Sequence, residues 1–174
     1  MEKIKIRKAG AGDLDEIMRI EKDCFPPQEA AGRESMEQRL HTFPHTCWVL
    51  EDEQKIFGFI SAMPARQEKL TDEMYHGIRL YREDGEWLMV FGVDVHPMYQ
   101  GRGFGGILIK EMIRETKAMG REGIVLLCKE RMIPFYEKFG FVQEGLSESS
   151  HGGEKWYSMR IRFRSSKDFY RRKA

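Results

Sequence analysis

The chain lacks several features that would place it in a specialised class of protein. Its 174 residues include three cysteines, Cys24, Cys47 and Cys128, and their spacing matches neither a disulfide framework nor a zinc motif. The five histidines are scattered and form no set of metal ligands. We therefore expect no metal site, and we expect a reducing compartment, which we take to be the cytoplasm.

Charge and hydrophobicity exclude further classes. Lys and Arg number 29 against 28 Asp and Glu, so a formal net charge of +1 offers no overall field to attract nucleic acid. No apolar run is long enough to span a bilayer, and the first residues lack the pattern of a secretion signal. A basic tail, roughly residues 164–174, is the exception, and we interpret it as a solvated end. We expect neither nucleic acid nor a membrane as a partner.

The chain also lacks linkers, repeats and low-complexity tracts, so we expect one domain over residues 1–174. Hydrophobic periodicity predicts an α/β order of elements. Asp13 begins the first helix, with Glu16 completing a capping box. The predicted strands are 4–6, 47–51, 56–63, 88–95, 124–128, 141–145 and 155–163, and the predicted helices start at 13, near 36, at the glycines after 100, and before 139.

Two segments in this order stand out. The runs 88–95 and 124–128 are continuously apolar, which is typical of interior strands covered on both faces. The charged segment 64–86 is longer than an ordinary hairpin loop. A functional flap and an excursion packed only on itself are equally compatible with that length.

A glycine-rich turn is the most informative feature of the chain. The predicted strand 88–95 ends at His96-Pro97, four glycines follow, and helical spacing resumes at Ile107. Backbone N–H groups at such a helix start, unobstructed by Cβ atoms, form a cradle for an anion. We infer a pyrophosphate ligand.

A dinucleotide is one alternative, because Gly101-x-Gly103-x-x-Gly106 matches the G-x-G-x-x-G fingerprint. That fingerprint should follow its strand immediately and open a βαβ unit. Here residues 97–100 intervene and the strand lies in mid-chain. Glu130, after the next strand, supplies the acidic residue that the fingerprint needs, so this alternative is disfavoured but stays open.

The same turn contains Gln100-x-x-Gly103-x-Gly105, which resembles the pyrophosphate motif of the GNAT superfamily of acyl-CoA-dependent N-acyltransferases. The later segment 134–141, Pro-Phe-Tyr-Glu-Lys-Phe-Gly-Phe, resembles the second signature of that family, in which a short helix carries a tyrosine and a strand begins at Gly-Phe. The two motifs occur in the family's order with a predicted strand between them. The chain is identified on this basis as resembling a GNAT N-acetyltransferase.

The resemblance implies a single-domain GNAT fold, in which a mixed sheet of about seven strands carries helices on both faces and splays between its fourth and fifth strands. It implies acetyl-CoA as co-substrate and no metal. It assigns the backbone amides of Val93 and Val95 to pantetheine and the thioester oxygen, and Tyr136 to the role of general acid. The residues expected at the diphosphate are Gln100, Gly101, Arg102, Gly103, Phe104, Gly105 and Gly106.

The segments 24–31 and 128–141 most resemble the arylalkylamine (serotonin) N-acetyltransferase branch and its microbial relatives. Vertebrate members place two histidines on the fourth strand, and a gap-free count puts these positions at Met89 and Phe91, which cannot titrate. The substitute bases are Glu29, Glu83, Asp84, Glu86 and Asp94. The residues expected at the acceptor pocket are Phe25, Pro26, Met63 and Leu127.

The expected function is acetyl transfer from acetyl-CoA to a primary amine, a small arylalkylamine or polyamine-like acceptor, by direct attack in a ternary complex. A protein or peptide N-terminal acetyltransferase is the enzymatic alternative. A module that binds acetyl-CoA without catalysis is the alternative of a different class. A homodimer through the last strand and the tail stays open.

Overall fold

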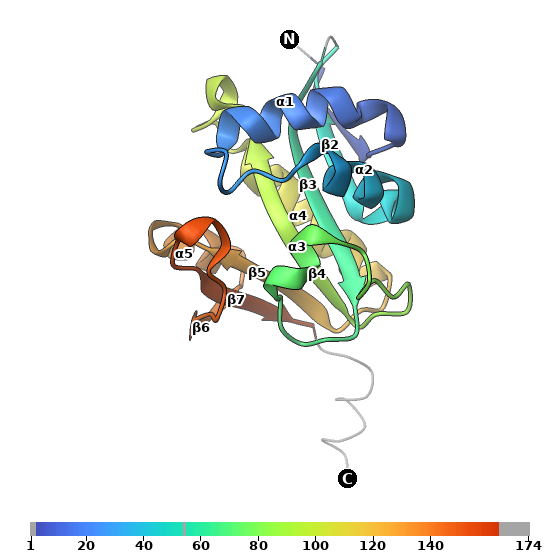
Figure 1. Ribbon diagram of the computed structural model, residues 1–174. Helices are drawn as coiled ribbons and strands as arrows, with labels where there is room; N and C mark the ends of the chain where they lie inside the picture. The colour runs from blue at the N-terminus through green and yellow to red at the C-terminus, as the bar shows by residue number, and fades with distance from the viewer. Residues whose placement is uncertain (1–2, 54, 164–174) are drawn as a thin grey trace.

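The computed structural model describes residues 3–53 and 55–163, which form a seven-stranded sheet flanked by helices (Figure 1). The strand order is β1-β2-β3-β4-β5-β7-β6. The strands are β1 (Lys5–Lys8), β2 (Cys47–Glu51), β3 (Ile56–Ala65), β4 (Trp87–Val95), β5 (Gly123–Cys128), β6 (Val142–Leu146) and β7 (Tyr157–Arg162). Among them β4 and β5 pair in parallel and the other pairs are antiparallel, so the predicted mixed sheet is confirmed.

Helices cover both faces of the sheet, as predicted (Figure 1). One core lies under α1 and α2 and the other under α4 and α5, and the apolar strands β4 and β5 contribute to both. The helices are α1 (Leu14–Cys24), α2 (Arg33–Thr42), α3 (Asp72–His76), α4 (Phe104–Ala118) and α5 (Ile133–Glu137). The predicted order is confirmed, and α3 is an addition within the segment 64–86.

The start of α1 differs from the predicted capping box. The Asp13 carboxylate accepts a hydrogen bond from the Gly10 N–H at 2.8 Å and pairs with Arg7 at 2.9 Å, so it stabilises the turn before the helix. Glu16 accepts the N–H of Ile56 at 2.8 Å and thereby ties α1 to the first residue of β3. Tertiary partners therefore take both carboxylates that the local pattern assigned to the cap.

β4 contains a bulge at Phe91, at the point where it separates from β5. Gly92 pairs with Ser61 and Val90 with Ala62 on β3, which leaves Phe91 as the extra residue. The bulge puts Phe91 and Gly92 on the same face of the sheet. The parallel ladder to β5 ends at Val90↔Leu126, so the last five residues of β4 have no strand on that edge. The predicted splay between the fourth and fifth strands is confirmed.

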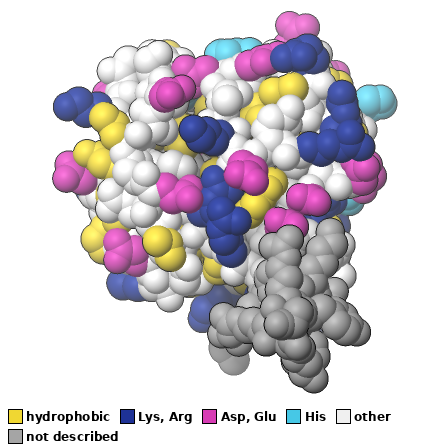
Figure 2. Space-filling view, turned by 90° about the horizontal axis from the view of Figure 1, so that it is seen from below, with side chains coloured by type: hydrophobic (Ala, Val, Ile, Leu, Met, Phe, Trp, Pro, Cys, Tyr) yellow, Lys and Arg dark blue, Asp and Glu magenta, His cyan; other side chains and the backbone are white. Residues whose placement is uncertain are grey.

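Surface features carry less information. On the face in Figure 2, basic and acidic side chains lie intermixed. No helix among residues 3–53 and 55–163 is long and apolar enough to cross a membrane. The basic tail predicted at 164–174 lies outside the described residues. β6 and β7 form one end of the sheet, and a dimer contact there stays a prediction.

Gly123 gives a test of how closely β5 packs. A Cβ at this position would lie 2.1 Å from the Ile161 carbonyl oxygen on β7 and 2.8 Å from the Trp87 ring. We expect Gly123→Ala to lower the free energy of unfolding in urea by about 1–3 kcal/mol, because two strands must separate. Gly12→Ala is the matched control, since a Cβ there meets nothing within 4 Å. Equal stability of the two variants would contradict the packing described.

Candidate active site

A cavity of about 710 Å³ opens at the splay between β4 and β5. It brings together the end of α1, the loop 25–32, the start of α2, the glycine turn, α5 and the loop between β6 and β7, several of which lie far apart in the sequence. Twelve of the fourteen residues predicted for the site line it. They are Phe25, Pro26, Val93, Val95, Gln100, Gly101, Gly103, Phe104, Gly105, Gly106, Leu127 and Tyr136.

Met63 and Arg102 are the two that do not line the cavity. Met63 is completely buried in the core under α1 and α2, because β3 lies behind β4 as seen from the splay. Its assignment to the acceptor pocket therefore has no structural support. The Arg102 guanidinium lies over the Tyr99 ring, 5.7 Å from the centroid, on an exposed residue.

The glycine turn has the geometry of an anion cradle. Gly101 and Gly103 adopt positive φ values of 78° and 85°, and Gly103 is the N-cap of α4. The Ile107 N–H donates to the Gly103 carbonyl at 3.2 Å, so the amides of residues 104–106 precede the helical ladder. Gln100 donates from Nε2 to the Val95 carbonyl at 2.9 Å and ties the turn to the end of β4.

Gly106 also has a packing role. A Cβ there would lie 3.0 Å from the ring of Phe139, which follows α5. The absence of a side chain therefore lets α4 approach the C-terminal end of α5. This contact joins the two predicted motifs, the glycine turn and the Phe-Tyr segment, into one unit.

The backbone of Val93 and Val95 faces the gap. The His96 N–H donates to the carbonyl of Phe57 on β3 at 2.8 Å, so His96 directs its backbone groups toward β3. Because successive residues of a strand direct their backbone groups to opposite edges, Val95 and Val93 direct theirs to the edge that β5 has left. In agreement, the Val95 carbonyl accepts the Cys24 thiol at 3.2 Å and the Gln100 amide, both from outside the sheet.

Tyr136 projects from α5 into the cavity wall. Its ring packs edge-on against Phe135 and Phe141, with centroids 5.1 and 5.9 Å away. No hydrogen bond to its hydroxyl is found among the described residues. Burial raises the pKa of Tyr136 above its usual range, and the nearby Cys128 and Asp94 raise it further. The phenol therefore holds its proton at neutral pH.

The five candidate bases separate clearly. Glu83 pairs with His45 at 2.9 Å and Asp84 with Arg66 at 2.7 Å, on exposed side chains, and Glu86 is exposed. Asp94 is buried, but it is not among the residues that line the cavity. Glu29 is the one of the five that lines it.

Asp94 forms a buried carboxyl pair with Glu21 of α1. An added Cβ on Gly92 would lie 2.8 Å from Asp94 Oδ1, which shows that Asp94 projects on the same face as Gly92. Burial raises the pKa of Asp94 well above its usual range, and the charge of Glu21 raises it further. Glu21 lines the cavity and accepts the Ala31 N–H at 3.1 Å.

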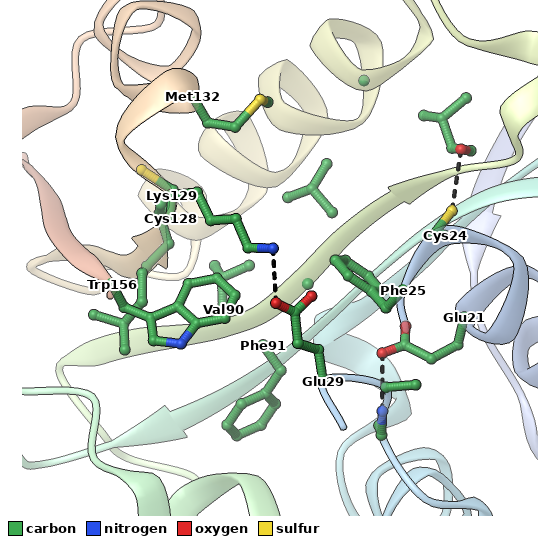
Figure 3. Close-up of a pocket in the computed structure, with 18 of the residues that line it drawn as sticks. Glu21, Cys24, Phe25, Glu29, Val90, Phe91, Cys128, Lys129, Met132 and Trp156 are labelled. Atoms are coloured by element: carbon green, nitrogen blue, oxygen red, sulfur yellow. Dashed lines mark hydrogen bonds and ion pairs between the residues drawn. The ribbon is translucent and has the colours of Figure 1, made fainter. Parts of the chain in front are cut away.

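Glu29 and Lys129 form an ion pair inside the cavity, with Nζ 2.7 Å from Oε1 (Figure 3). The Glu29 side chain is 2% exposed and that of Lys129 is 26% exposed. Lys129 follows β5, and its Nζ lies 5.7 Å from the centroid of the Trp156 ring. Glu29 was predicted only as one of several bases, and Lys129 was not predicted at all.

α3 and the loop between β6 and β7 contact each other beside the Glu29–Lys129 pair. His151, in the loop between β6 and β7, stacks on Tyr75 of α3 at 4.6 Å. His151 Nε2 also lies 2.8 Å from the Glu29 carbonyl oxygen. The segment 64–86 is therefore not packed only on itself. The sequence analysis does not predict these contacts. The one feature of the sequence that points to them is the Gly152-Gly153 pair, because glycine permits a close approach: a Cβ on Gly152 would lie 2.7 Å from Glu29 Cγ.

Met89 and Phe91 occupy the two positions at which the vertebrate arylalkylamine enzymes are expected to carry histidines. Phe91 lines the cavity, and the Arg39 guanidinium lies over its ring at 4.1 Å. Met89 is buried in the core under α1 and α2. The two positions that carry histidines in the vertebrate enzymes are thus held here by a phenyl ring beneath a buried guanidinium and by a core methionine. No group of side chains suited to hold a metal ion occurs within the part of the chain that is described.

A mixed sheet that splays between two parallel strands, with a glycine turn and a helix N-terminus beside the gap, makes this an α/β domain with an acyltransferase-like arrangement. The acetyltransferase (GNAT) family model matches residues 14–141, and the chain belongs to this family. It is 28% identical over 148 residues to the probable hydrolase YhcX of Bacillus subtilis (79% of this chain, 28% of that protein). It is 28% identical over 95 residues to serotonin N-acetyltransferase of Mesocricetus auratus (54% of this chain, 44% of that protein). The chain therefore spans less than half the length of either relative.

Solved structures share the fold. The loading GNATL domain of CurA from Lyngbya majuscula superposes with a TM-score of 0.80 at 18% identity, over 92% of this chain and 98% of that one. The GphF GNAT-like decarboxylase in complex with isobutyryl-CoA gives 0.79 at 21%, over 92% and 100%. The ribosomal-protein-S18-alanine N-acetyltransferase from Escherichia coli gives 0.65 at 18%, over 92% and 94%. At these identities the likeness establishes the fold.

The carboxyl pair predicts a pH dependence of stability. Asp94 keeps a proton in the folded state that it loses in the unfolded state above its ordinary pKa of 3.8. Its contribution to the free energy of unfolding therefore decreases as pH rises from about 4 toward the folded pKa. Asp94→Asn removes this titration, so we expect the stability of the variant relative to wild type to increase with pH in urea unfolding between pH 4 and 7. A stability difference between Asp94→Asn and wild type that is constant with pH would contradict the assignment.

Proposed function

We propose that the protein transfers an acetyl group from acetyl-CoA to the primary amine of a small acceptor, arylalkylamine or polyamine-like, by direct attack in a ternary complex. One observation carries the proposal: the open edge of β4, the glycine turn and Tyr136 converge on a single cavity. Family membership supports acetyl transfer, and the GphF neighbour is in complex with an acyl-CoA.

The cradle suits the diphosphate of acetyl-CoA. The amides of residues 104–106 lie at the N-terminus of α4, where the helix dipole favours negative charge. Gly101 and Gly103 leave the backbone accessible, since a Cβ on either would meet nothing within 4 Å. The amides of Val93 and Val95 extend the donor row along β4. A donor fixed at a developing oxyanion is typically worth about 3–4 kcal/mol.

The reaction forms a bond from the acceptor nitrogen to the acetyl carbonyl carbon and breaks the bond from that carbon to sulfur. The amine nitrogen loses one proton and the departing sulfur gains one. Tyr136 donates the proton to sulfur, because its hydroxyl is protonated at neutral pH and lines the cavity. The sum is an amide and a free thiol.

The end of the cavity near Glu29 favours a small acceptor. The stack of His151 on Tyr75 and the close approach of Gly152 to Glu29 bring three segments together on the acceptor side of the cavity, which supports a small acceptor over an extended peptide. An N-terminal acetyltransferase is the second candidate, and its support is the fold shared with the Escherichia coli enzyme. Likeness to serotonin N-acetyltransferase supports the arylalkylamine class. Release of CoA thiol with a panel of amines separates catalysis from acetyl-CoA binding alone.

Gly103 tests the cradle. Gly103→Val forces a β-branched residue into positive φ at the N-cap and places two methyl groups where the phosphate is expected. We expect the KM for acetyl-CoA to rise at least about tenfold, about 1.4 kcal/mol. Gly120→Val is the matched control: its φ of 77° imposes similar strain, also in open space, but it lies beyond the other end of α4. Equal affinity for acetyl-CoA in the two folded variants would remove the cradle.

Tyr136 tests the proton donor. Tyr136→Phe keeps the ring contacts and removes the hydroxyl, so we expect kcat to fall by roughly 10- to 1000-fold. Calorimetry should find the affinity for acetyl-CoA unchanged. Tyr157→Phe, on β7 and outside the cavity lining, is the control. Turnover of the Tyr136 variant at the control's level would exclude the role.

A further inference from the structure

The Glu29–Lys129 ion pair is unusual because little else in the described structure holds it. Neither carboxylate oxygen of Glu29 has a hydrogen-bond donor besides the Lys129 ammonium, and both oxygens are buried. A buried carboxylate normally gathers several donors, because losing water without compensation is costly. Figure 3 shows this carboxylate projecting between Lys129 and Phe25, into the centre of the cavity.

The position of Glu29 is nevertheless fixed. Its N–H donates to the Pro26 carbonyl at 2.9 Å, and its own carbonyl oxygen lies 2.8 Å from His151 Nε2. Gly152 packs directly against its Cγ. The backbone of Glu29 is therefore held from two sides, while its carboxylate has one partner, Lys129. A carboxylate in a fixed position with hydrogen-bonding capacity to spare is suited to bind a ligand.

Glu21, the other carboxylate on the cavity wall, is already committed. It accepts the Ala31 N–H and lies beside Asp94, whose pKa is raised, with the buried Arg39 nearby. The hydrogen bond to Ala31 anchors the loop 25–32 to α1. Glu29 is therefore the carboxylate free to meet an acceptor.

The surroundings of the pair define what fits. Trp156, Phe91, Phe25 and Tyr75 line the same cavity and supply flat apolar surfaces. The negative member of the pair comes from the loop before α2 and the positive member from the segment after β5. The walls therefore suit an aromatic side chain, and the pair offers one site of each charge.

We propose that the acceptor is an aromatic α-amino acid, whose ammonium binds Glu29 and whose carboxylate binds Lys129. This inference rests on the proposed acetyl transfer and narrows its acceptor, from arylalkylamines in general to those that carry a carboxylate, and it disfavours a polyamine. A zwitterionic head group inserted between the two side chains keeps the site neutral. A simple amine adds a net positive charge to a pair that is already balanced, in a largely buried environment.

The charge balance also holds through the reaction. When the acceptor ammonium gives a proton to Glu29, the amine becomes nucleophilic and the Glu29 carboxyl becomes neutral. Lys129 would then lose its counter-ion, but the carboxylate of the amino acid replaces it. Neither an amine without a carboxylate nor the N-terminus of a peptide, whose first carboxyl is an amide, offers that replacement.

Three acceptors that differ in one group test the proposal: phenylalanine, phenethylamine and phenylalaninamide. CoA thiol release at saturating acetyl-CoA gives kcat/KM for each. We expect phenylalanine to be favoured over the other two by at least about tenfold. Lys129→Gln should lower kcat/KM for phenylalanine by a similar factor but should not lower it for the other two, because without Lys129 their ammonium alone balances the charge of Glu29.

Two further variants keep the test sound if the unpaired Glu29 in Lys129→Gln disturbs folding. Glu29→Gln/Lys129→Gln removes both charges together, and we expect it to bind acetyl-CoA as wild type does in calorimetry but to lose acetylation of phenylalanine. Lys138→Gln, an exposed lysine outside the cavity, is the matched control.

The outcomes separate the two proposals. Equal use of the three acceptors, a uniform loss in Lys129→Gln, or acetyl-CoA binding with none of the three acetylated would each overturn the amino-acid assignment. Failure of folded wild-type protein to bind acetyl-CoA would overturn the proposed function itself.

Discussion

The departure of β4 from β5 is the constraint on which the rest of the structure depends. Two parallel strands that stayed paired would consume the backbone donors of Val93 and Val95 and fill the cavity with a continuous ladder. The extra residue at Phe91 bends β4 and ends this pairing at Val90. The glycine turn then follows at the end of the bent strand, so one irregularity creates the gap and places the turn and the N-terminus of α4 beside it.

The same bulge distributes polar chemistry over two surfaces. Beyond Phe91, the backbone of Val93 and Val95 faces the gap at the strand edge, while Gly92 and Asp94 share the face that α1 covers. The backbone groups proposed to bind a thioester are thereby separated from the buried carboxyl pair. The Asp94 carboxylate occupies the space that a side chain at position 92 would need, so the carboxyl pair depends on glycine at that position.

Local patterns are enough to predict the sheet and to bring the glycine turn and Tyr136 to the cavity, because each depends on residues close together in sequence; the role of Tyr136 stays a prediction. Met63 was assigned wrongly to the cavity, since its apolar character says nothing about which side of β4 its strand lies on. Lys129, Trp156 and His151 were missed for the complementary reason. His151 and Trp156 lie in a loop between β6 and β7 that packs against α3 and the loop 25–32, and Lys129 meets Trp156 and Glu29 there; no periodicity encodes such contacts.

This division between local and distant determinants follows the two halves of the cavity. The half proposed to hold phosphate and thioester is built from backbone amides, which accept many side-chain identities, so it depends on strand geometry and on glycine. The half proposed to receive the acceptor is built from side chains on three separate loops, and it contains the buried Glu29–Lys129 ion pair. On the proposed function, a change in any of these loops would alter the choice of acceptor without disturbing the bulge. Selectivity for an acceptor would then reside in the loops, and the capacity for transfer in the sheet.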